Sequence, residues 1–180
     1  EQNGLACTDC HNPMAQFSGR ALERREAITS TCFGCHQQQR LQFQKASHMP
    51  LPEGKMASTD CHNPHGSPTA PLLKADTVNQ LCYSCHQEKR GPFLWEHAPV
   101  SDSCFTGHDA HGSNNDRMLV AKQPFLCQRC HVTSRHPPTI YDGYLLQASQ
   151  NANKIYGKSC LNCHQQVHGS NAPGGKAFLR

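Results

Sequence analysis

The sequence predicts a fold of short α-helices and irregular segments, with little or no β-structure, packed around prosthetic groups instead of around its own side chains. Only 36% of the 180 residues are hydrophobic and 7% aromatic, which is a small supply for the core of one domain. A short motif of Cys and His also recurs along the chain at nearly constant intervals. No segment between the motifs has the composition of a strand.

The repeated motif is CxxCH, of which Cys82–His86 is one of five intact copies. On a helix its two thiols and imidazole stand at i, i+3 and i+4 and project from one face. Two such thiols can form thioethers with the vinyl groups of a porphyrin, while the imidazole binds the iron from one axial side. CxxCH is the attachment signature of haem c. We therefore expect a multihaem cytochrome c fold, an extended haem wire in which the haems form the core.

Disulfides and zinc are the alternatives to haem for a chain with 12 Cys and 13 His. A disulfide scaffold accounts for the Cys but not for a His after every intact pair. Zinc ribbons need two CxxC pairs per metal, and five intact pairs leave one over. These counts favour haem, and a zinc-binding structural module stays as the third hypothesis.

The motifs begin at residues 7, 32, 58, 82, 104, 127 and 160. We expect one domain over residues 1–180, built of seven modules of about 1–31, 32–57, 58–81, 82–103, 104–126, 127–159 and 160–180. Two types alternate. In the first type, at 7, 58, 104 and 160, a second His normally follows soon after the motif, and Gly-Ser comes directly behind it. In the second type, at 32, 82 and 127, the second His comes after a helix stop.

Helices are predicted mainly in the second module type. One is expected from Thr29 or Ser30 to about Lys45, and another from Asp76 or Thr77 to Lys89, because these residues can cap a helix. Pro124 is expected to begin a shorter one.

Two motifs are incomplete, with Ser58 and Gly107 in place of a first and a second Cys. The expected thioether residues are Cys7, Cys10, Cys32, Cys35, Cys61, Cys82, Cys85, Cys104, Cys127, Cys130, Cys160 and Cys163. The expected proximal iron ligands are His11, His36, His62, His86, His108, His131 and His164. Because the damaged motifs keep their His, we expect seven haems, two of them through a single thioether at Cys61 and Cys104, with five as the minimum.

Seven six-coordinate haems need fourteen axial ligands, and the remaining six His are the candidates for the distal side. They are His48, His65, His97, His111, His136 and His168. Met14 stands where its module type otherwise has His, so it is either the fourteenth ligand or a packing residue. The alternative for any single His is an ordinary surface or core role. Which distal residue serves which haem is left open.

Charge and hydropathy point to an exported protein without a nucleic-acid partner. The formal charge of +4 comes from scattered basic residues and not from a basic stripe, and the propionates of seven ferric haems would add about −7. No apolar run approaches the ~18 residues of a transmembrane helix. The chain opens at Glu1 without a leader, and haem is attached outside the bacterial cytoplasm. We expect a periplasmic, outer-membrane-associated or extracellular protein whose signal peptide has been removed.

Several segments resemble the DmsE/MtrA-type decahaem cytochromes, periplasmic subunits of outer-membrane electron conduits. They are residues 61–67 (CHNPHGS), 72–74, 77–79, 85–93 running to 95–97, and 160–164 with 167–171. The chain resembles the last seven modules of that family, with Ser58, Gly107 and Met14 replacing the expected Cys, Cys and His. The resemblance implies a haem wire between periplasmic donors and an outer-membrane or extracellular acceptor.

The function expected from these ligands is electron transfer and not enzyme catalysis, because six-coordinate iron offers a substrate no open position. The expected partners are other cytochromes, an outer-membrane porin, or copies of the chain in an assembly. The runner-up is a multihaem reductase, which needs one haem that has lost an axial ligand.

Overall fold

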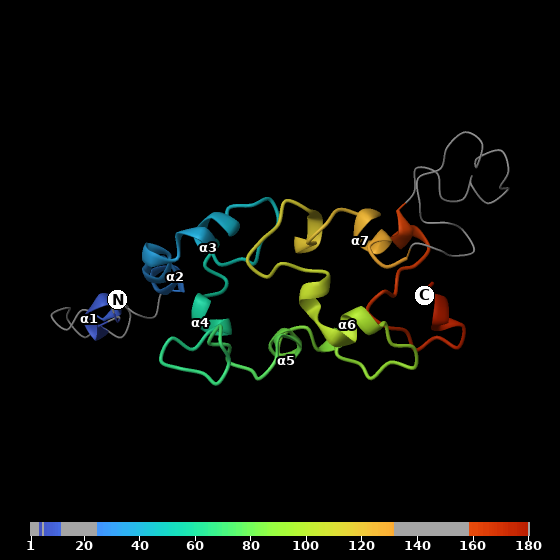
Figure 1. The fold of residues 1–180 in the computed structure, drawn as a ribbon, viewed down its shortest axis with the longest axis horizontal. Coiled ribbons are helices and arrows are strands. Elements are labelled where there is room, and N and C mark those ends of the chain that lie inside the picture. The colour runs from blue at the N-terminus through green and yellow to red at the C-terminus, as the bar shows by residue number, and fades with distance from the viewer. Residues whose placement is uncertain (1–3, 5, 12–24, 132–158, 180) are drawn as a thin grey trace.

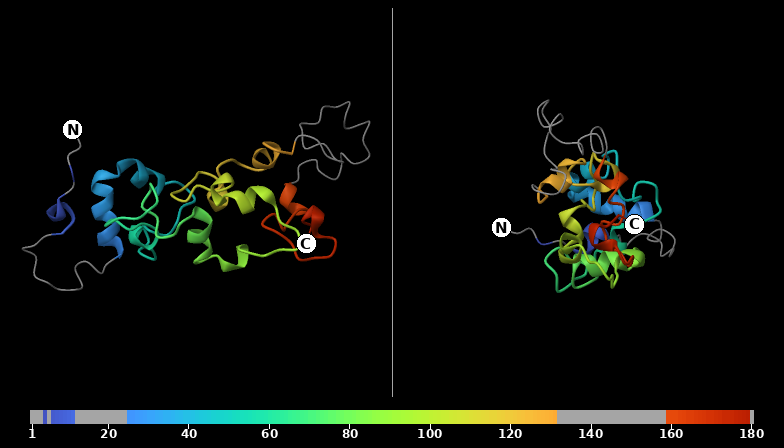
Figure 2. Two further views of the ribbon diagram at one scale, coloured as in Figure 1. Left: turned by 60° about the horizontal axis from the view of Figure 1, so that its bottom comes forward. Right: turned by 90° about the vertical axis from the view of Figure 1, so that its right-hand side faces the viewer.

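The computed structural model describes residues 4, 6–11, 25–131 and 159–179 as an elongated succession of short helices and loops (Figure 1). Helices α2, α3 and α7 follow one long side of the molecule, and α4, α5 and α6 follow the other. The first and last modules lie at opposite ends of the long axis, which the first view of Figure 2 also shows.

All helices of the described residues are short. The α-helices are α1 (Cys7–Cys10), α2 (Arg25–Cys35), α3 (Gln37–Gln42), α4 (Ser58–Cys61), α5 (Val78–Tyr83), α6 (Ala98–Asp102) and α7 (Phe125–Gln128). The 3₁₀ turns are η1 (Gln87–Lys89), η2 (Cys104–Thr106), η3 (Asp116–Met118), η4 (Cys160–Asn162) and η5 (Gly175–Ala177). In this part of the chain β-structure is limited to four isolated bridges. The predicted class, a helix-poor multihaem fold without a sheet, is confirmed.

The predicted helix limits were correct in part. Thr77 caps α5 by accepting a hydrogen bond from the Gln80 N–H, and Pro124 precedes α7. The other limits were wrong. The helix of the second module contains Arg25 and therefore starts upstream of Thr29, and it breaks at His36. The other long helix ends at Tyr83 and is followed, after His86, by η1.

The break at the motif His has a local cause. His86 has ψ 55°, which leaves the helical region, and His36 has ψ 62°. Both imidazoles therefore follow the helical turn and do not lie on it. Cys32 and Cys35 lie on α2, whereas Cys82 lies on α5 and Cys85 follows its end. The sequence prediction of one unbroken helical face for all three groups is corrected accordingly.

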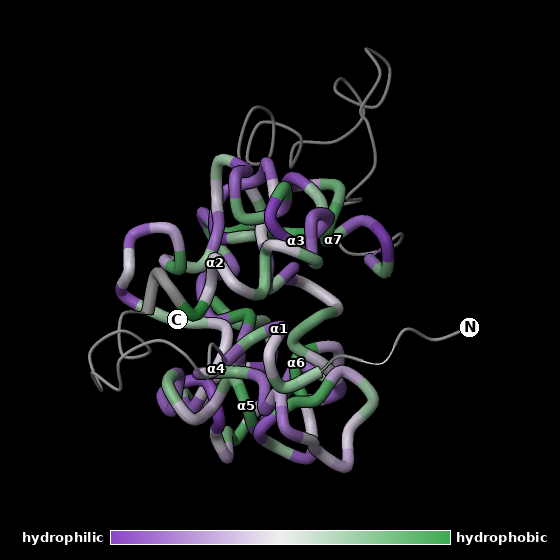
Figure 3. Tube along the Cα trace, turned by 90° about the vertical axis from the view of Figure 1, so that its left-hand side faces the viewer, coloured by the Kyte–Doolittle hydropathy of each residue, from purple (hydrophilic) through white to green (hydrophobic). Residues whose placement is uncertain are grey.

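The side chains form very little core. The buried apolar residues of the described part are Phe43, Leu51, Ala57 and Leu73, and no large side chain there is fully buried. Figure 3 shows polar and apolar residues interleaved along the trace. Such a chain needs another source of buried apolar surface, as the composition predicted.

The Gly-Ser pairs of the first module type shape the loop that carries the second His. Gly66, Gly112 and Gly169 have φ of 133°, 143° and 133°, a region that only Gly enters at low cost. The following Ser residues join distant modules in two places. Ser113 exchanges two backbone hydrogen bonds with Ser47, and Ser170 does the same with Trp95. Modules far apart in sequence are thereby linked side by side.

Replacing Gly112 by Ala should destabilise the protein strongly. The added Cβ would overlap the backbone oxygen of Gln42, and φ at this position is strained for any L-residue, which costs about 1–3 kcal/mol. We expect the thermal melting midpoint of the holoprotein to fall by several degrees. Gly34→Ala is the matched control, because a Cβ there meets nothing within 4 Å and Ala favours the helix. An equal loss in both variants would contradict this account.

Candidate haem-binding sites

All seven motifs fold into the same closed turn. In each, the backbone N–H of the motif His donates to the carbonyl of the residue four positions earlier, at 2.8–3.0 Å. The damaged motifs do so as well: His62 donates to Ser58 at 2.9 Å and His108 to Cys104 at 3.0 Å. The turn is a property of the backbone and does not require both thiols.

Hydrogen bonds also orient the imidazoles. The Nδ1 atoms of His62 and His108 lie 2.7 Å and 2.8 Å from the carbonyl oxygens of Pro71 and Arg117, each nine residues downstream. In the same way, Nδ1 of His97 lies 2.9 Å from the carbonyl oxygen of Val167. An imidazole that donates Nδ1–H to a carbonyl presents its Nε2 lone pair to a metal.

Eight of the imidazoles lie in four facing pairs. The ring-centre separations are 6.0 Å for His11 and His65, 6.3 Å for His62 and His111, 6.1 Å for His97 and His131, and 6.1 Å for His108 and His168. The ring planes differ by 16° to 33°. Two metal–nitrogen bonds of about 2 Å, plus about 1 Å from each nitrogen to its ring centre, place two axial imidazoles about 6 Å apart. The pairs therefore fit the two faces of a haem iron.

The pairs join different modules, and they follow a rule that the sequence left open. In the first module type, the motif His faces the second His of the next module of that type, as His62 faces His111. In the second type one pair is seen among the described residues: His131 faces His97, the second His of the preceding module of that type.

The other candidate ligands lie outside these four pairs. The Nδ1 of His48 is 2.7 Å from the Lys45 carbonyl oxygen and its Nε2 is 3.0 Å from Oε1 of Glu53. His36 and His86 close their motif turns, and His164 also places Nδ1 on the Ala177 carbonyl oxygen. Met14 and His136 lie outside the described residues, so their assignment stays a prediction.

The environment of two paired imidazoles favours their neutral, ligating form. Burial lowers the pKa of His111, and the nearby His62 lowers it further, although Asp109 opposes this effect. Burial likewise lowers the pKa of His168, with Lys89 and His108 adding to the shift. A group held uncharged at neutral pH needs no deprotonation before it binds a metal.

Thiols of neighbouring modules meet at two places. The side chains of Cys82 and Cys104 are within hydrogen-bonding distance, as are those of Cys127 and Cys160. Burial, together with the adjoining thiol, raises the pKa of Cys82 to about 12 and that of Cys127 to about 11. Protonated thiols are poor nucleophiles, so these two residues do not fit thiol catalysis. Their contacts place attachment points of successive modules side by side.

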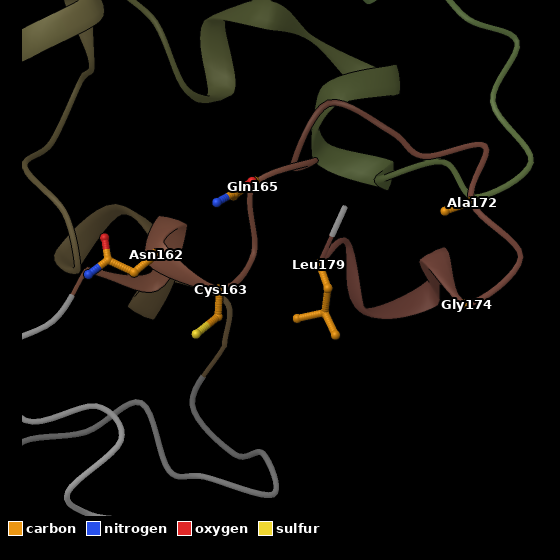
Figure 4. Close-up of a pocket in the computed structure, with 6 residues that line it drawn as sticks. All are labelled: Asn162, Cys163, Gln165, Ala172, Gly174 and Leu179. Carbon is orange, nitrogen blue, oxygen red and sulfur yellow. The ribbon is translucent and has the colours of Figure 1, made fainter.

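A hollow of about 530 Å³ lies beside the last motif (Figure 4). Its lining residues are Asn162, Cys163, Gln165, Ala172, Gly174 and Leu179. Figure 4 shows the Cys163 thiol and the Leu179 side chain projecting to the same side. A mainly apolar hollow next to a motif thiol suits a large apolar cofactor.

Within the described residues, no group of three or more His, Cys, Asp or Glu side chains could hold a bare metal ion. The ligands come in facing imidazole pairs beside motif thiols, which is the donor set of haem c. Haem c supplies a one-electron iron couple when it is bound. Fold and donor set together define a multihaem c-type cytochrome.

The chain belongs to the family of proteins with a doubled CXXCH motif, whose sequence model matches residues 2–41, 48–91 and 97–136. It is an MtrA-type multihaem cytochrome: it is 44% identical over 178 residues to a protein of Shewanella baltica (strain OS185) called multiheme cytochrome MtrA. The match covers 98% of this chain but 53% of that relative, so the chain spans about half of its length. The expected family and the expected haem c attachment are thereby confirmed. In the described part of the chain, no helix has the length and apolar character to cross a membrane.

Restoring the missing thiol with Gly107→Cys should complete a two-thioether site without strain. A Cβ at Gly107 meets nothing within 4 Å, and the turn from Cys104 to His108 is already closed. We expect the haem count to stay unchanged and the α-band of the pyridine haemochrome to shift to shorter wavelength, since one vinyl group becomes a thioether. Gly107→Ser adds a Cβ without a thiol and should leave the band in place. A rise in the haem count would contradict single-thioether attachment at Cys104.

Proposed function

We propose that this chain carries electrons along seven haem c groups between periplasmic donors and an outer-membrane or extracellular acceptor. Two of the haems are held by one thioether each, at Cys61 and Cys104. The observation that carries the count is the geometry of the damaged motifs. Their imidazoles, His62 and His108, keep the closed turn and face a second imidazole at 6.3 Å and 6.1 Å.

The proposed axial ligands follow from the facing pairs. Four haems have His11 with His65, His62 with His111, His108 with His168, and His131 with His97. By analogy with His131 and His97, we assign His48 to the haem of His86. In the described structure the Nε2 of His48 is bonded to Glu53, so this fifth assignment requires that contact to open. His36, His164, His136 and Met14 are left without assigned partners.

Electron transfer is favoured over substrate chemistry by the same pairs. An iron with an imidazole on each face has no position for a substrate, so electrons pass without bond changes at the metal. Seven haems in 180 residues leave about 26 residues for each. Neighbouring thiols of successive modules, such as Cys82 and Cys104, support close spacing of the attached groups.

The partners and location are proposed from the family and from the chemistry of attachment. Haem c is attached outside the bacterial cytoplasm, so the chain is exported and works in the periplasm or at the outer membrane. Its partners are other cytochromes, with an outer-membrane porin or further copies of the chain as the remaining candidates. No feature favours a nucleic-acid partner.

The haem count is tested by the mass of the intact protein under denaturing conditions. Seven covalently attached haems are expected, whereas five would show that the damaged motifs are empty. Tryptic cleavage after Lys55 and Lys74 isolates Cys61 on its own peptide, and cleavage after Arg90 and Arg117 isolates Cys104. Each peptide should carry one haem.

The axial assignment is tested by carbon monoxide binding to the reduced protein. The wild type should show no shift of its Soret band, because we propose two protein ligands for each iron, with His136 and Met14 as the remaining candidates for the haems of His36 and His164; a shift would favour the reductase alternative. His111→Ala should open one haem per chain to carbon monoxide, by removing the imidazole that faces His62. Asn114→Ala, an exposed change in the same loop, should behave as wild type. The absence of carbon monoxide binding in His111→Ala would overturn this ligand pair.

A further inference from the structure

The imidazole of His111 is held by a side chain, unlike several other candidate ligands. Its Nδ1 lies 3.2 Å from Oε1 of Gln42. When the Nε2 of an imidazole binds a metal, Nδ1 carries the proton and donates it to its partner. In the described residues, Nδ1 lies on a backbone carbonyl oxygen in five other candidate ligands: His48, His62, His97, His108 and His164. The partner of His111 can therefore be changed by one substitution, which a backbone carbonyl does not allow.

Gln42 is placed beside His111 by a close contact between two distant segments. It is the last residue of α3, and its backbone oxygen lies so near Gly112 that a Cβ on this glycine would overlap it. A few residues further along both segments, Ser47 and Ser113 exchange backbone hydrogen bonds of 3.0 Å and 2.8 Å. Contacts on the backbone thus fix the end of α3 against the loop that carries His111.

Phe43, the residue after Gln42, packs against the same imidazole. Its ring centre lies 5.5 Å from that of His111, with 54° between the ring planes. Phe43 is 6% exposed and lies 5.6 Å from Phe33, measured between ring centres. Gln42 itself is half-buried. Water competes less for a hydrogen bond in such surroundings, so the Gln42 oxygen acts on the imidazole more strongly than it would at an exposed site.

A hydrogen bond from Nδ1 changes what the imidazole offers to iron. Donation to an oxygen acceptor makes the ring a more basic ligand, and a more basic ligand stabilises ferric iron relative to ferrous iron. Reduction adds one electron to the iron and leaves both axial ligands in place. An acceptor on Nδ1 therefore lowers the reduction potential of the haem that the imidazole serves.

We infer that Gln42 is a positioning residue that lowers the reduction potential of the haem attached to Cys61. It acts through His111, which faces His62 in the proposed ligand pair of that haem. The inference rests on the seven-haem function above and adds a residue that tunes one of its sites. The potential of this haem then depends on three modules, those that begin at residues 32, 58 and 104.

The haem of Cys61 can be followed by itself in a Gly107→Cys background. There the haem of Cys104 gains its second thioether, so the haem of Cys61 is the one that keeps a vinyl group. Its α-band should lie at longer wavelength than the bands of the other haems. The test is a reductive titration with dithionite, which gives one electron to each ferric iron, with the absorbance of this band recorded against the solution potential.

Two substitutions of Gln42 should shift the midpoint of this band in opposite directions. Gln42→Leu removes the acceptor with little change in size and should raise the midpoint potential. Gln42→Glu keeps the shape and places a carboxylate on Nδ1, which accepts more strongly, so the midpoint potential should fall. Gln44→Leu and Gln44→Glu make the same changes at an exposed side chain two positions further on, and should leave the midpoint near that of the background protein.

Opposite shifts distinguish tuning of the ligand from loosening of the site, which would move both midpoints the same way. Neither Gln42 variant should bind carbon monoxide, because His111 keeps its place. The inference is overturned if the midpoint is unchanged in both variants, if both shift in one direction, or if Gln42→Leu binds carbon monoxide. Absence of the long-wavelength band from the Gly107→Cys protein would instead refute the seven-haem function, because Cys61 would then carry no haem.

Discussion

The rest of this structure depends on one kind of contact, in which the motif His of one module faces the second His of another module. Side-chain burial is sparse, strands are reduced to isolated bridges in the described residues, and the longest α-helix there has 11 residues. In such a chain an iron that takes one ligand from each of two modules is a cross-link. His62 and His111 are 49 positions apart in sequence, and bonding both to one metal closes that loop. The backbone bridges from Ser47 to Ser113 and from Trp95 to Ser170 run between modules in the same way.

The two damaged motifs show that the parts of a haem site are separable. The hydrogen bond from the motif His to the residue four positions earlier forms with Ser58 as well as with Cys. The carbonyl that holds Nδ1 comes from a loop nine residues downstream, so it too is independent of the thiols. A thiol can therefore be lost while the axial geometry is retained, provided that something else limits the motion of the cofactor.

The proximity of thiols from successive modules also bears on electron transfer. Cys82 and Cys127 lie beside the first thiols of the next modules, Cys104 and Cys160. Groups attached to such neighbours must themselves be neighbours. The arrangement that lets a small chain enclose many cofactors with few apolar residues is thus also the arrangement that favours transfer between them. The close spacing of the attached haems therefore serves both the stability of the chain and electron transfer between the haems.

The sequence by itself determined the chemistry and the fold class, because thioether attachment needs two thiols and an imidazole at fixed local spacing. It also located the helix caps at Thr77 and Pro124, which depend on neighbouring residues alone. It did not determine the upstream start of α2 or the helix breaks at His36 and His86, where the imidazole leaves the helix. Only the tertiary structure paired His11 with His65 and His131 with His97. The partners are 34 to 54 positions apart, and the sequence is equally compatible with a second His from the preceding module and one from the following module. The contact between Thr29 and the Ser58 backbone was also invisible in the sequence, since α2 and α4 become neighbours only when the modules pack.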